Sequence, residues 1–117
     1  MRESRAMTEV RDLFAGMNRT EKARAIELEA LRRSGKIAQW WYEAWTFRLA
    51  DRTTYTPDFV VQETDGALRA EETKGFWRDD ARVKVKVFAA LFPLPLVVLC
   101  PKKGGGWNEE HFNQRAA

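Results

Sequence analysis

The segment from residue 53 to residue 74 constrains the fold more than any other part of this chain. Residues 53–63 are rich in β-branched and aromatic residues, a composition typical of strands, and residues 67–74 are predicted as the strand that follows. Between them lies Thr64-Asp65-Gly66. Antiparallel strands are often joined by a three-residue turn that ends on glycine, because its last position requires a left-handed conformation. The segment therefore predicts a β-hairpin.

Before this hairpin, the sequence predicts one helix and one strand. The helix begins at Asn18 or Thr20, either of which can cap it, and ends at Gly35, where the left-handed conformation is expected. Residues 37–50 are dominated by aromatic and β-branched residues, so they predict one long strand. The buried face of the helix is predicted from apolar residues at helical spacing: Ala25, Leu28 and Leu31.

After the hairpin, residues 81–92 fit two patterns. Their valines alternate with charged residues as in a strand, whereas Val83, Val87, Phe88 and Leu91 fall on one face of a helix. A helix is predicted, because the apolar pattern continues without a break until the prolines that follow it. We expect Asp79 or Asp80 to cap this helix. Residues 96–100 are a continuous apolar run, typical of a buried strand, and residues 102–106 predict a loop.

These elements predict an α/β fold in the order α-β-β-β-α-β, with a mixed sheet flanked by helices. A chain of 117 residues suits one domain. We place this domain at residues 18–107, between a weakly patterned segment, 1–17, and a tail, 108–117. No apolar run has the length of a membrane span, and the N-terminus lacks the features of a signal peptide. We therefore expect a cytoplasmic protein with no membrane partner.

The composition limits the chemistry that the chain can perform. It contains one cysteine and one histidine, which excludes an internal disulfide and a single-chain zinc finger and disfavours a Ser-His-Asp triad. Catalysis must therefore use carboxylates, lysines and a hard metal ion. Residues 37–75 have a net charge of −3 and lie between basic segments of +3 and +4. This distribution suits a polyanion bound around a cation site, or simply a solvated mixed-charge surface.

The candidate chemical residues are Asp58, Glu72 and Lys74. Glu72 and Lys74 are two apart on one strand, so their side chains share a face, and Glu71 faces the other way. A two-residue turn would direct Asp58 away from Glu72, whereas a three-residue turn, or a bulge near Pro57, places the two carboxylates opposite each other. We predict the second arrangement. Opposed carboxylates repel unless a cation lies between them, and with a backbone carbonyl they suit Mg²⁺.

Two runs in this part of the chain, Tyr55-Thr56-Pro57-Asp58-Phe59-Val60-Val61 and Glu72-Thr73-Lys74-Gly75, resemble the PD-(D/E)xK nuclease superfamily. The continuation through Gly75-Phe76-Trp77-Arg78-Asp79 and Lys84-Val85-Lys86 is similar to a small phage-encoded nuclease-like family. The resemblance covers about residues 18–107. It implies a restriction-endonuclease-like core and a Mg²⁺-dependent DNA endonuclease, in which Mn²⁺ would substitute for Mg²⁺. Asp58 and Glu72 would be metal ligands with the Thr73 carbonyl, and Lys74 the catalytic lysine.

The resemblance also implies residues beyond this motif. Several members of the superfamily, including Holliday-junction resolvases, add a glutamate from the first helix, for which Glu21 is the best match and Glu27 and Glu29 are weaker ones. The expected substrate is DNA, possibly branched, and paired cuts would imply a homodimer. The alternative is a nuclease fold that binds nucleic acid without cutting it. Candidate nucleic-acid contacts are Trp77, Arg78, Lys84 and Lys86.

Overall fold

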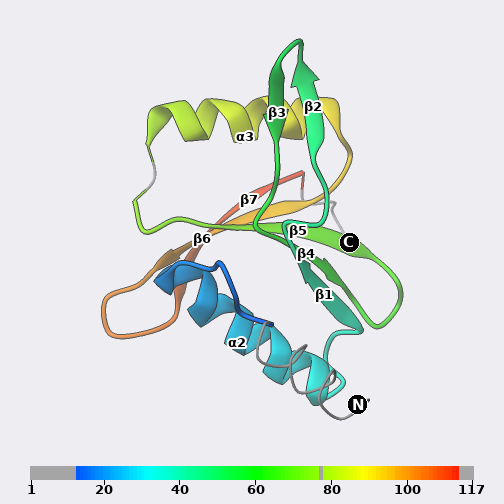
Figure 1. Cartoon of the computed structure of the whole chain (residues 1–117), viewed down its shortest axis with the longest axis vertical. Coiled ribbons are helices and arrows are strands. Elements are labelled where there is room, and N and C mark those ends of the chain that lie inside the picture. The colour runs from blue at the N-terminus through cyan, green and yellow to red at the C-terminus, as the bar shows by residue number, and fades with distance from the viewer. Residues whose placement is uncertain (1–12, 77, 114–117) are drawn as a thin grey trace.

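The structure is a computed structural model, and it describes residues 13–76 and 78–113 (Figure 1). Two helices lie on opposite faces of a five-stranded mixed sheet, and a separate two-stranded sheet lies beside one of them. The predicted α/β class, with helices flanking a mixed sheet, is confirmed. Neither helix in the described part of the chain is long and apolar enough to span a membrane.

The five-stranded sheet has the order β1-β4-β5-β6-β7. Neighbouring strands are antiparallel except for β5 and β6, which are parallel. A parallel pair needs a crossover connection, and helix α3 (Asp79–Leu91) provides it. The strands of this sheet are β1 (Gln39–Tyr42), β4 (Phe59–Gln62), β5 (Leu68–Thr73), β6 (Leu96–Pro101) and β7 (Trp107–Phe112).

Helix α2 (Arg19–Arg33) begins and ends where the sequence predicts. Of the two candidate caps, Asn18 is the one used: its side chain accepts from the Glu21 amide, and the Glu21 side chain accepts from the Asn18 amide. This reciprocal pair satisfies two backbone donors that a helix end otherwise leaves open. Gly35 has a φ of 76°, the left-handed conformation that was predicted. The helix buries Ala25 and Leu28 on the sheet face that carries Phe59.

The central hairpin has the register that the three-residue turn predicts. Phe59 pairs with Glu71 and Gln62 with Leu68. Gly66 has a φ of 92°, so it takes the left-handed position of the turn. Continuing this register by one residue places Asp58 beside Glu72, which is the arrangement that the candidate site requires.

Two predicted long strands, at residues 37–50 and 53–63, are each broken in the structure. The first divides into β1 and β2 (Phe47–Ala50), and the second into β3 (Thr53–Tyr55) and β4. Glu43 has a left-handed φ of 48°, and Pro57 cannot donate to a strand ladder. The pairing between β1 and β4 therefore stops at Tyr42 and Phe59, close to these two residues. The β2–β3 hairpin then packs on α3, with Phe47 and Tyr55 against Phe88.

Helix α3 is confirmed, but its predicted cap and most of its predicted buried face are wrong. The N-cap residue is Arg78, which makes no side-chain capping bond. The side chains buried against the sheet are Val85 and Phe88, whereas Val83, Val87 and Leu91 are exposed. The sequence of this helix places apolar residues on two faces. Contact with the β2–β3 hairpin and the sheet determines which of the two faces is buried.

The C-terminal segment contains a strand where the sequence predicts only a tail. β7 pairs with β6 along its whole length and forms an edge of the sheet. Its sequence, Trp-Asn-Glu-Glu-His-Phe, is poor in β-branched residues and carries charges, so local preference does not mark it as a strand. Pairing with the apolar strand β6 therefore determines its conformation.

Candidate active site

Two buried carboxylates meet where the broken hairpin reaches β5. Asp58 is 9% exposed and Glu72 is 6% exposed. The backbone amide of Asp58 donates a hydrogen bond to Oε1 of Glu72 at 3.2 Å, so the two residues are direct neighbours, as the hairpin register predicts. Asp58 follows Pro57 and directly precedes β4. Glu72 is the next-to-last residue of β5.

Each carboxylate is oriented by fixed donors. Oδ2 of Asp58 accepts from the Thr73 amide at 2.8 Å and from the Thr73 hydroxyl at 2.9 Å. Oε1 of Glu72 also accepts from the Tyr55 hydroxyl at 3.0 Å, and Oε2 lies 3.2 Å from Nζ of Lys74. Within residues 13–76 and 78–113, both of these hydrogen bonds reach Oδ2 of Asp58 and none reaches Oδ1.

The electrostatics of the pair favour a bound cation. Burial and the charge of Glu72 raise the pKa of Asp58 to about 7, although the hydrogen bonds from Thr73 oppose this change. Burial likewise raises the pKa of Glu72, against the opposing effects of Lys74 and Tyr55. Two carboxylates that resist ionisation together are stabilised when a positive ion lies between them.

A cavity of about 210 Å³ adjoins Glu72, the member of this pair that lines it, between β3, β5 and α3. Glu72, Lys74 and Tyr55 line it from the sheet side, and Lys84 lines it from the helix. Lys86 is exposed and does not line the cavity. Of the two helix lysines that the sequence left open, Lys84 is therefore the one beside the candidate site.

The donor atoms fit a hard divalent metal ion. In the described residues, no three side chains of His, Cys, Asp or Glu converge on one point. The available set is the carboxylates of Asp58 and Glu72, with the Thr73 carbonyl as the predicted third ligand. Mg²⁺ commonly binds through one or two carboxylates and keeps several waters, so a set of this size and chemistry suits it.

Glu21 lies at the border of the candidate site. Its Oε1 accepts from the Asn18 amide at 2.9 Å and from the Tyr42 hydroxyl at 3.0 Å, so the carboxylate caps α2. Its charge contributes to the raised pKa of Asp58. The weaker candidates are engaged elsewhere: Glu27 accepts from Arg24, and Glu29 accepts from Arg32.

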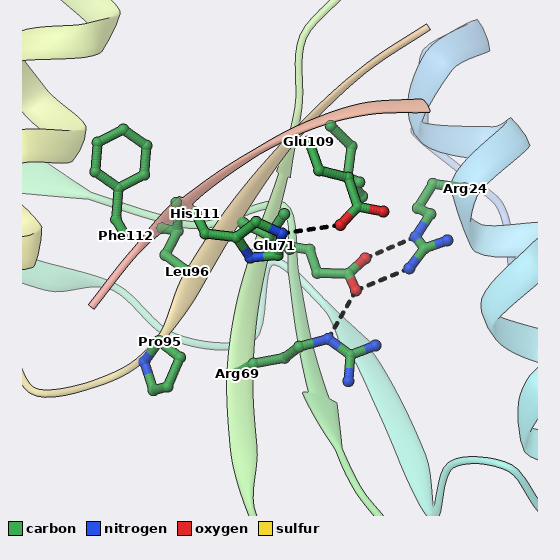
Figure 2. A pocket seen from close by; sticks show the side chains of 10 residues that line it. Arg24, Arg69, Glu71, Pro95, Leu96, Glu109, His111 and Phe112 are labelled. Carbon is green, nitrogen blue, oxygen red and sulfur yellow. Dashed lines mark hydrogen bonds and ion pairs between the residues drawn. The ribbon is translucent and has the colours of Figure 1, made fainter. Parts of the chain in front are cut away.

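Glu71, which the sequence excludes from the site, lies on the opposite face of the sheet (Figure 2). It is fully buried and accepts from Nε of Arg24 at 2.7 Å, from Nη2 of Arg24 at 2.9 Å and from Nε of Arg69 at 2.9 Å. The two adjacent glutamates therefore have different environments: Glu71 is held by two arginines, and Glu72 lies beside a second carboxylate.

The predicted nucleic-acid contacts are partly placed by the structure. Arg78 is exposed at the start of α3, and Lys84 lines the same cavity as Lys74. Trp77 lies outside the described residues. Sequence reasoning missed the orienting roles of Tyr55 and of the Thr73 side chain, because no sequence pattern marks a hydroxyl that reaches a carboxylate across the fold.

Comparison with known proteins gives no relative: no family model matches the chain, and neither a curated protein nor a solved structure matches it significantly. The function must therefore be inferred from the geometry of the site and from the residues that form it.

Proposed function

We propose that this chain is a metal-dependent endonuclease that hydrolyses phosphodiester bonds in DNA. The supporting observation is the pair of buried carboxylates, Asp58 and Glu72, with the ammonium of Lys74 3.2 Å from Glu72. The resemblance to the PD-(D/E)xK superfamily assigns these three residues to the same site. The β4–β5 hairpin and the crossover from β5 through α3 to β6 are compatible with a restriction-endonuclease-like core.

The proposed cofactor is Mg²⁺, with Mn²⁺ as a substitute, held by Asp58, Glu72 and the Thr73 carbonyl. When bound, such an ion polarises a phosphate oxygen and lowers the pKa of a coordinated water. The Thr73 amide and hydroxyl keep Asp58 in one orientation, and Tyr55 does the same for Glu72. The protein thus prepares the ligands before the ion arrives.

Lys74 supplies the positive charge that the hydrolysis of a phosphodiester requires. Its position directly after the end of β5, two residues after Glu72, places it at the cavity beside that carboxylate. There it can orient the attacking water or stabilise the charge that develops on the phosphate oxygens. Lys84 lines the same cavity and adds a second cation to the place where the phosphate would lie.

The alternative is a nuclease fold that binds nucleic acid without cleaving it. One observation favours this second function: the described residues hold no third acidic or histidine side chain on the carboxylate pair. Both functions require nucleic-acid binding, but only the first requires Asp58 and Lys74 for turnover.

The deciding experiment incubates the purified full-length chain with linear, flapped and four-way-junction DNA in the presence of Mg²⁺ or Mn²⁺. We expect cleavage, and we expect Asp58→Asn, Glu72→Gln and Lys74→Ala each to reduce its rate by about a hundredfold or more. Asp51→Asn, at the exposed β2–β3 turn, is the matched control. Retention of DNA without cleavage by any of these preparations would establish the binding function instead. Preferential cutting of the junction would support the proposed branched substrate and homodimer.

A further inference from the structure

In the part of the chain that the structure describes, two cavities outside the candidate active site are each lined by two arginine or lysine side chains, and they differ in how these charges are neutralised. The first, of about 320 Å³, is the one drawn in Figure 2, on the sheet face that carries Glu71. Both of its arginines, Arg24 and Arg69, point at Glu71 and bind it (Figure 2). These positive charges are already compensated within the protein, so this cavity offers little to an anionic ligand.

The second cavity, of about 450 Å³, lies between α2 and the loop that joins β6 to β7. Arg19 lines it from the helix, Lys102 lines it from the loop, and Trp107 contributes from the first residue of β7. Lys103, the next residue of the loop, is also exposed. Within the described residues, none of the three cations has an ion-pair partner.

The carboxylate that lines this second cavity does not neutralise those cations. Glu27 accepts a hydrogen bond from Nε1 of Trp107 at 2.6 Å, and it forms an ion pair with Arg24 at 3.0 Å. It is therefore engaged with other groups. The cavity keeps a net positive charge contributed from two separate elements.

The elements that form this cavity lie near the end of β5 at which the candidate active site is found. The start of α2, the β6–β7 loop and the segment that leaves β5 for α3 all lie on the left in Figure 1. A Cβ added at Gly75 would lie 3.9 Å from the hydroxyl of Thr20, which also lines the cavity. In the parallel register Thr73 pairs with Leu99, so Lys102 lies three residues, about 10 Å, further along the sheet.

We propose that Arg19, Lys102 and Lys103 form a second binding surface for the sugar–phosphate backbone of the nucleic acid. The inference rests on the proposed function, because it assigns this surface to the substrate that the candidate site would cut. Phosphates along one strand of DNA are spaced by about 3.4 Å of helix axis, so about 10 Å corresponds to about three nucleotides. The substrate would extend from Lys84 and Lys74 across the sheet edge to the β6–β7 loop.

The test measures the affinity of the full-length chain for a fluorescent DNA duplex over a range of salt concentrations, without divalent metal so that no cleavage occurs. Each phosphate contact contributes about 0.9 to the slope of log affinity against log salt on duplex DNA. We expect Lys102→Ala/Lys103→Ala to reduce this slope by about 2 and to weaken binding by about tenfold at moderate salt. Lys36→Ala, an exposed lysine beyond the other end of α2, is the matched control and should leave both values unchanged.

The outcomes separate this inference from the proposed function. If the wild-type chain binds and cleaves DNA but the double variant binds with an unchanged slope, the second surface is wrong and the nuclease function stands. If the wild-type chain shows no salt-dependent binding, both are wrong. An equal loss in Lys36→Ala would show a general charge effect and would also overturn the assignment. Single-stranded DNA and duplex RNA of the same sequence identify which backbone the surface accepts.

Discussion

The hydroxyl of Tyr55 donates a hydrogen bond to Oε1 of Glu72 at 3.0 Å, and both residues are buried. Tyr55 is the last residue of β3, in the two-stranded sheet, whereas Glu72 is on β5 in the main sheet. This bond connects the two sheets at the candidate site. The β2–β3 hairpin therefore orients a proposed metal ligand in addition to covering α3.

Replacing this hydroxyl tests whether it prepares the ligand. We expect Tyr55→Phe to lower the free energy of unfolding by about 1 kcal/mol and to weaken Mg²⁺ binding by about tenfold or more, since the hydrogen-bond partners of metal ligands contribute to metal affinity. Urea unfolding and calorimetric titration with Mg²⁺ measure the two effects. Tyr42→Phe, which removes the hydroxyl bond to Glu21, should lower stability alone. Unaltered Mg²⁺ affinity in Tyr55→Phe would contradict this role.

The raised pKa of Asp58 predicts how the stability of the metal-free protein depends on pH. In the unfolded chain this carboxyl has its ordinary pKa of 3.8, and in the folded chain its pKa is about 7. The folded state therefore binds more protons between these values, so the free energy of unfolding falls as pH rises from about 4 to about 7 and then levels off. The loss due to this group is on the order of 4 kcal/mol.

Asp58→Asn should remove most of this pH dependence and should make the metal-free protein more stable than the wild type above about pH 7. Urea unfolding in a chelator at several pH values measures both effects. A variant that loses stability with pH as steeply as the wild type would show that Asp58 does not have the raised pKa.

Addition of Mg²⁺ should stabilise the wild-type chain, because the ion binds the folded state and relieves the repulsion between Asp58 and Glu72. At about 100 times the dissociation constant the gain is about 2.7 kcal/mol. Thermal unfolding in Mg²⁺, with K⁺ at equal ionic strength as the control, measures it. The same addition should leave the unfolding temperature of Glu72→Gln nearly unchanged. A similar rise in both proteins would place the ion elsewhere.

The adjacent glutamates predict opposite mutational effects. Glu71→Gln leaves Arg24 and Arg69 without their buried carboxylate and should cost on the order of 3 kcal/mol of stability, while the folded molecules still cleave DNA. Glu72→Gln should keep the fold and abolish cleavage. Unfolding curves and cleavage rates, corrected for the folded fraction, measure both variants. Loss of cleavage in fully folded Glu71→Gln would contradict the division of roles.

Much of the candidate site could be predicted because it depends on local geometry. A turn that ends at Gly66 determines the hairpin register, and the register places Asp58 next to Glu72. The alternation of a strand places Glu71 and Glu72 on opposite faces. The start of α2 at Asn18 follows from capping chemistry within four residues.

What the sequence determined by itself was therefore set by interactions between residues close along the chain: the hairpin, the ends of α2 and the pairing of the two acids. The tertiary structure alone decided which face of α3 is buried, that β7 is a strand, that Lys84 lines the cavity, and that Tyr55 holds Glu72. These features depend on contacts between distant segments, where burial and pairing outweigh local preference. No pattern of neighbouring residues in the sequence indicates those contacts.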